Sequence, residues 1–163
     1  MRPRTRPVRH NRSDLMTDNT MAGRWSPKTD RVLREAGWTP QRRVATEQWE
    51  RTLRESDGFS AHEKVRAFLA EFGGLTFALT GAGAKVALLP FSINPLEGQW
   101  ESDIFEEMSE YAGTAVYPIG EMAKGHLFLG MAEDGSIFRG RDAVDFFAES
   151  GDQALDKLIV GYR

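Results

Sequence analysis

The sequence contains no cysteine, which excludes disulfides and Cys-ligated metals and fits a reducing cytoplasm. Its three histidines, His10, His62 and His126, form no H-x-x-x-H or H-E-x-x-H pattern, so the sequence gives no support for a zinc site. No apolar run approaches the roughly 20 residues that span a bilayer, and the Arg-rich N-terminus lacks the apolar segment of a secretory signal. We therefore expect a cytoplasmic protein without a metal or a membrane partner.

The common catalytic signatures are missing as well. No serine lies in a G-x-S-x-G turn, which leaves a hydrolase triad without its usual local signal. The glycine-rich stretch Thr80–Lys85 is followed by Val86 where a Walker loop needs Ser or Thr. A strand rather than a helix is expected after it, which argues against a dinucleotide loop. We interpret the stretch as a flexible hairpin turn.

Glu121 is the best remaining candidate for a general acid or base. That role needs a partner carboxylate or histidine in a dry cleft. The alternative is that Glu121 ends a strand and accepts hydrogen bonds from the following turn, "EMAKG". We favour the alternative, and the sequence therefore predicts no catalytic residue and no cofactor.

The charge is unevenly distributed along the chain. The net charge is −3 at pH 7, and residues 1–20 hold five arginines against two aspartates, which is 5 − 2 = +3. The chain from Met21 onward therefore carries −3 − 3 = −6. The basic stretch has no apolar period, so we expect a disordered tail over residues 1–21 and one domain over 22–163. An acidic body disfavours nucleic acid and favours a basic protein partner.

Helical periodicity appears in several segments. Helices are expected from Ser26 to Gly37, from Thr46 to the "SDG" turn, from Ser60 to Gly73, from about Glu101 to Tyr111, and around Leu155–Tyr162. In the third, Ser60 and Glu63 have the spacing of a capping box. In the fourth, Ile104, Met108 and Tyr111 are expected to face inward.

A period of two marks the strands. Strands are expected in "LTFAL", "VALLPF", "AVYPIG", "HLFLGM" and "SIFRG". Asp134-Gly135 predicts a hairpin between the last two. "DAVDFFAES" is left open as a short helix or an aromatic loop. Clustered rather than alternating elements predict an α+β fold, with a mainly antiparallel sheet of about five to six strands covered by helices.

The fourth predicted helix concentrates negative charge. No Lys or Arg lies between Lys85 and Lys124. Asp103, Glu106, Glu107 and Glu110 follow the i, i+3, i+4, i+7 spacing of one helix face, and Glu101 precedes them. This pattern fits a solvated helix face and an acidic docking surface equally well. These five side chains are the candidate partner-binding residues.

Five segments in order, "VLREAGWTPQR", "FLAEFGGL", "YPIGE", "EDGSIF" and "ALDKLIVG", resemble the SUKH superfamily of bacterial immunity proteins, in particular its third family. The resemblance covers about Trp25 to Gly161. It implies a SUKH fold and a protein that binds and neutralises the toxin domain of a polymorphic toxin system. Many of these toxin domains are nucleases. It implies no catalytic residue and no cofactor. The residues that would form the structural signature are Gly37, Trp38, Phe72, Gly73, Gly74, Pro118, Gly120 and Glu121.

Three functions follow from these observations. The first is an immunity protein that binds a basic cognate toxin directly. The second is a regulatory or scaffolding interaction domain without a toxin partner. The third is a small hydrolase or nucleotide-binding enzyme, which requires a pocket that joins Glu121 to His126 or to another carboxylate.

Overall fold

The computed structural model describes residues 23–162, and the predicted tail over residues 1–21 lies outside them. Its centre is a six-stranded sheet in which every strand pairs antiparallel with the next strand along the chain. The strands are β1 (Thr76–Phe77), β2 (Phe91–Ser92), β3 (Val116–Met122), β4 (Leu127–Ala132), β5 (Ile137–Gly140) and β6 (Val144–Ala148). The predicted α+β fold with an antiparallel sheet is confirmed.

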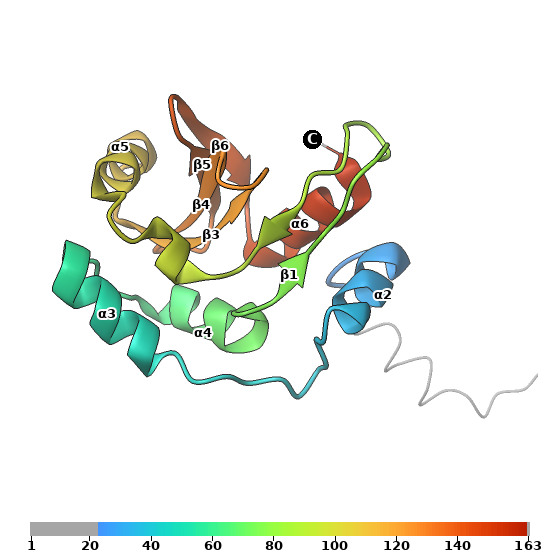
Figure 1. Ribbon diagram of the computed structural model, residues 1–163, viewed down its shortest axis with the longest axis horizontal. Coiled ribbons are helices and arrows are strands. Elements are labelled where there is room, and N and C mark those ends of the chain that lie inside the picture. The colour runs from blue at the N-terminus through green and yellow to red at the C-terminus, as the bar shows by residue number, and fades with distance from the viewer. Residues whose placement is uncertain (1–22, 163) are drawn as a thin grey trace, which may run out of the picture.

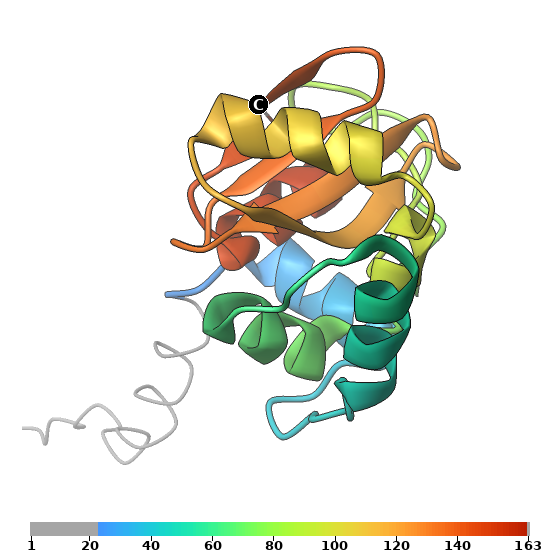
Figure 2. The same ribbon diagram turned by 90° about the vertical axis from the view of Figure 1, so that its left-hand side faces the viewer.

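Helices cover both faces of this sheet (Figure 1). They are α2 (Pro27–Glu35), α3 (Glu47–Asp57), α4 (Glu63–Phe72), α5 (Ser102–Ala112) and α6 (Gly151–Asp156), which continues as the π-helical turn η2 (Lys157–Gly161). A short 3-10 turn, η1 (Pro95–Gly98), precedes α5. Figure 2 shows α5 lying alone across one face of the sheet, with α4 and α6 on the opposite side.

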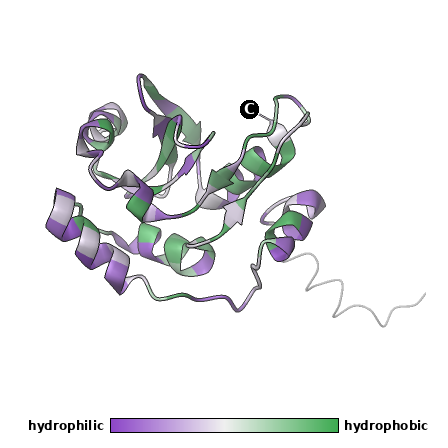
Figure 3. Ribbon diagram, in the orientation of Figure 1, coloured by the Kyte–Doolittle hydropathy of each residue, from purple (hydrophilic) through white to green (hydrophobic). Residues whose placement is uncertain are grey.

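The alternation of side chains along β3, β4 and β5 creates the two cores. Tyr117, Ile119, Leu129 and Met131 belong to the larger cluster under α2, α4 and α6. Val116, Phe128, Ala132 and Phe138 form the smaller cluster with Phe105 and Met108 of α5. Hydrophobic residues accordingly follow the strands, and hydrophilic ones lie on the outer sides of the helices (Figure 3). The Tyr117–Phe138 segment is therefore a sheet meander, as its period of two predicts.

The caps of α2 and α4 show where sequence patterns succeed and fail. The Ser26 hydroxyl accepts a hydrogen bond from the Thr29 N–H and Pro27 opens the helix, as predicted. The capping box predicted at Ser60 and Glu63 is wrong, because His62 is the N-cap of α4. Its Nδ1 accepts a hydrogen bond from the Val65 N–H, and its Nε2 lies 3.1 Å from the Met131 carbonyl oxygen. One imidazole thus satisfies a free helix N–H and a strand carbonyl at once.

Two expectations about the strands need correction. "DAVDFFAES" is neither a helix nor a loop, because Val144–Ala148 pairs with β5 as an edge strand. Phe147 packs into the larger core, whereas the ring of Phe146 contacts Phe138 on the α5 side. The strands expected at "LTFAL" and "VALLPF" are shorter than predicted, with two paired residues each, because the chain between them leaves the sheet as a hairpin.

Candidate partner-binding surface

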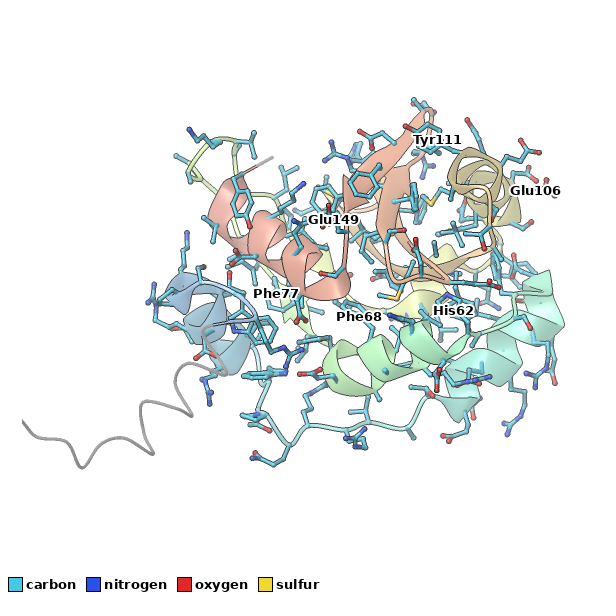
Figure 4. The ribbon with its side chains drawn as sticks, turned by 180° about the vertical axis from the view of Figure 1, so that it is seen from behind. His62, Phe68, Phe77, Glu106, Tyr111 and Glu149 are labelled. Atoms are coloured by element: carbon cyan, nitrogen blue, oxygen red, sulfur yellow. The ribbon has the colours of Figure 1, made fainter. Side chains whose placement is uncertain are left out.

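The predicted acidic residues lie on the solvent side of α5. Asp103, Glu106, Glu107 and Glu110 are exposed, and Glu101 immediately precedes the helix and is half-buried. Figure 4 shows Glu106 on the side of α5 that faces away from the sheet. None of the ion pairs between residues 23–162 includes any of the five carboxylates. Over a helix about 16 Å long, the surface therefore carries negative charge that no neighbouring cation neutralises.

The inward face of α5 is rotated from the predicted one. Phe105 and Met108 are buried, and Ala112 packs beside them. Tyr111, which was expected to face inward, is 57% exposed. At 100° per residue, a stripe centred on positions 105, 108 and 112 leaves position 111 on the flank. The Tyr111 ring meets the edge of Phe138 with centroids 6.0 Å apart, so it remains packed on one side only.

An exposed tryptophan stands at the other end of α5. The Trp100 side chain is 72% exposed, and its backbone has a φ of 73°, in the left-handed region. This conformation is unfavourable for a bulky L residue. The backbone N–H of Trp100 donates to both carboxylate oxygens of Asp57, at 2.9 and 3.2 Å. Asp57, at the end of α3, thus holds this backbone in place. Sequence reasoning missed this residue, and its only signal was a Trp in a polar stretch with no apolar partner at helix or strand spacing.

The structure places Glu121 near a second carboxylate that the sequence pattern did not indicate. Glu97 in η1 accepts a 2.6 Å hydrogen bond from the Ser92 hydroxyl, and its Oε1 is buried without a partner among the described residues. Burial, together with the charge of Glu121, raises the pKa of Glu97 to about 7. Ser92 pairs with Glu121 across β2 and β3, which explains why these groups meet.

The turn after Glu121 is not held by that carboxylate. Between the residues that the structure places, no hydrogen bond reaches the Glu121 side chain, although it lies beside Gly125. The turn is held instead by the Ala123 N–H, which donates to the Pro90 carbonyl, and by the His126 ring, whose Nδ1 lies 2.6 Å from the Ala123 oxygen. His126 is exposed, and neither His126 nor Glu121 lines the cleft beside the hairpin of residues 80–89.

Within the described part of the chain, no group of three His, Asp or Glu side chains could hold a metal ion. No helix in that part is both long and apolar enough to cross a bilayer.

Comparison with known families adds a finding that the geometry alone does not give. The profile of the SUKH-3 immunity protein family matches residues 25–161. The chain belongs to this family. The match includes every helix and strand described above. Searches of the curated proteins and of the solved structures found no significant match.

In this SUKH-3 protein the predicted signature residues near α2 and α4 have packing roles. Trp38 is 1% exposed and stacks on Phe72, and its Nε1 donates to Glu71. Gly37 and Gly74 have φ values of 113° and 91°, which favour glycine. A Cβ at Gly73 would lie 2.6 Å from the Trp49 ring, so only glycine fits beneath that side chain.

The remaining signature residues lie together on β3. A register shift occurs between Pro118 and Gly120, where a Cβ on Gly120 would meet the Ser92 carbonyl. Glu121 follows directly, and its charge acts on Glu97. Their placement indicates that these residues shape the junction of β2 and β3.

Proposed function

We propose that this SUKH-3 immunity protein binds the toxin domain of a polymorphic toxin system in the cytoplasm and blocks it by direct contact. The acidic surface of α5, defined as Glu101, Asp103, Glu106, Glu107 and Glu110, would form the centre of the interface. The observation that carries this proposal is that an unneutralised acidic helix is flanked by two exposed aromatic side chains, Trp100 and Tyr111.

The carboxylates and the aromatic side chains would contribute to binding in different ways. Unpaired carboxylates steer a basic partner and raise the association rate. Tryptophan and tyrosine are the residue types that most often dominate binding energy at interfaces. Because Asp57 already holds the Trp100 backbone, little further ordering would be needed when a partner binds. The surface thus combines fast encounter with a preorganised anchor.

A nuclease fits this surface particularly well. A nuclease must present positive charge to phosphate backbones around its active site. An acidic helix of about 11 residues could lie along such a groove and exclude the nucleic acid. We propose a basic, nucleic-acid-binding face of the toxin as the contact surface.

Charge reversal tests the proposal. The variant Glu106→Lys/Glu107→Lys changes the helix charge by +4 and is expected to lower the association rate with the toxin by tenfold or more at low salt. The salt dependence of association should become weaker. The matched control is Glu35→Lys/Glu149→Lys, which reverses two exposed carboxylates on α2 and before α6. Equal association rates for both variants would remove the acidic surface from the interface.

A further inference from the structure

A second surface feature lies away from α5, beside the C-terminal end of the chain. A cleft of about 600 Å³ lies between the hairpin of residues 80–89, strands β5 and β6, and η2. Figure 1 shows the hairpin and the C-terminal end side by side. This volume is within the range of about 300–1,000 Å³ that is typical of small-molecule sites.

Backbone hydrogen bonds fix the hairpin wall of this cleft. The N–H groups of Lys85 and Val86 both donate to the Gly161 carbonyl, at 2.6 and 2.9 Å. The Ala84 N–H donates to the Val160 carbonyl at 2.9 Å. A Cβ on Gly161 would lie 2.7 Å from the Gly83 Cα, so the two segments are in close backbone contact. The glycine-rich stretch that we interpreted as a flexible turn is thus fastened to the end of the chain, and the cleft is preformed.

The apolar lining of the cleft is unusual for a surface. Five large apolar side chains are exposed among the residues that the structure describes, namely Val86, Leu89, Trp100, Tyr111 and Phe146. Three of them, Val86, Leu89 and Phe146, line the cleft. Met122 and Leu158 complete its apolar part. Exposed apolar side chains that gather in a cleft are more typical of a binding site than of an ordinary solvent-facing surface.

The charged groups that line the cleft are both cations. The Arg139 guanidinium and the Lys157 ammonium lie 4.9 and 5.3 Å from the centre of the Phe147 ring. Arg139 pairs with Asp145 at 3.0 Å, whereas Lys157 donates to the Phe147 carbonyl and forms no ion pair within residues 23–162. The cleft lining therefore includes one cation, Lys157, that no ion pair among the described residues neutralises, and the nearby Asp156 carboxylate accepts from the Tyr162 hydroxyl.

We propose that this cleft binds a small amphiphilic monoanion, with a carboxylate head and an apolar body. The head would contact Arg139 and Lys157, because these cations retain free N–H groups. The body would lie along Val86, Leu89 and Phe146. The inference does not depend on the proposed function, because the cleft is built from other elements than α5.

The proposal can be tested on the full-length protein with two compounds that differ only in the head group. Decanoate and decanol are titrated separately by calorimetry, below the concentration at which decanoate forms micelles. Decanoate is expected to bind, and decanol to bind at least about tenfold more weakly, as the loss of a charge-assisted hydrogen bond requires. Arg139→Gln should weaken decanoate binding by roughly tenfold. The control Lys64→Gln, an exposed change on α4, should leave it unchanged.

Asp145→Asn gives a result that partial unfolding cannot imitate. Removal of the carboxylate that pairs with Arg139 should tighten decanoate binding. Equal affinity for decanoate and decanol, unchanged binding by Arg139→Gln, or no decanoate binding up to millimolar concentration would each overturn the proposal. Sedimentation with anionic phospholipid vesicles, without binding of free decanoate, would contradict it too, because that result would assign the cations to a membrane surface.

Discussion

The substitution Trp100→Gly tests whether the Trp100 side chain binds a partner or stabilises the folded protein. Trp100 is 72% exposed, so only 100 − 72 = 28% of its side chain is covered in the folded protein. Of about 250 Å² for a tryptophan side chain, this is about 70 Å², worth at most about 2 kcal/mol of hydrophobic stabilisation. Glycine adopts the left-handed backbone conformation without strain, which stabilises the folded protein by roughly 1 kcal/mol. The free energy of unfolding should therefore change by less than about 1 kcal/mol.

The effect on binding should be much larger. Truncation of an aromatic anchor that a partner covers costs about 2 kcal/mol or more, which is roughly a 30-fold loss of affinity for the proposed toxin partner. The matched control is Trp38→Ala, because Trp38 is 1% exposed, stacks on Phe72 and should cost about 3–5 kcal/mol of stability. Unfolding is followed by far-UV circular dichroism in urea, and binding by surface plasmon resonance.

Two results would refute this reasoning. A loss of stability by Trp100→Gly comparable to that of Trp38→Ala would mean that the exposed tryptophan supports the fold. Unchanged affinity for the toxin in a stable Trp100→Gly variant would remove Trp100 from the interface.

Two further predictions concern stability. The pKa of Glu97 is about 7 in the folded protein, above its ordinary value of 4.5. The stability that the protonated Glu97 contributes is therefore fully present below about pH 4.5 and is lost as pH rises through about 7. After a discount for its partial exposure, Glu97→Gln should remove about 1–2 kcal/mol of the pH dependence of unfolding between about pH 5 and pH 8. Superimposable urea midpoints for both proteins across that range would contradict this assignment. Gly73→Ala should lower the free energy of unfolding by about 1–3 kcal/mol, because the new Cβ meets the Trp49 ring and the Leu69 carbonyl. A loss below about 0.5 kcal/mol would mean that Trp49 moves aside freely.

The parts of the fold that local patterns govern could be predicted from the sequence. The period of two in β3 to β5, the Asp134-Gly135 turn and the buried stripe of α4 all depend on neighbours within a few residues. The Asp134 carboxylate accepts from the Ser136 N–H at 2.9 Å, and Gly135 has a φ of 95°, as a tight turn requires. Consecutive Phe146 and Phe147 hid β6, because two adjacent apolar residues obscure a period of two.

Features that depend on distant partners could not be predicted. The imidazole of His62, which caps α4, also lies 3.1 Å from the Met131 carbonyl of β4, a partner that is 69 residues away in the sequence. Glu97 lies beside Glu121 through the pairing of β2 with β3. The backbone of Trp100 is held by a carboxylate on α3, 43 residues away in the sequence. The acidic spacing of α5 was visible in the sequence, but the exposure of the two aromatic side chains that flank it was not.

The most direct test of the account is inhibition of a toxin by the purified protein. A candidate toxin domain, identified by co-purification with this protein, is assayed with increasing amounts of the wild-type protein, and growth is measured when both are expressed together. We expect a stable complex, loss of toxin activity at equimolar protein, and restored growth that Glu106→Lys/Glu107→Lys weakens. Full inhibition without any detectable complex, or a complex that leaves the toxin active, would contradict neutralisation by direct binding.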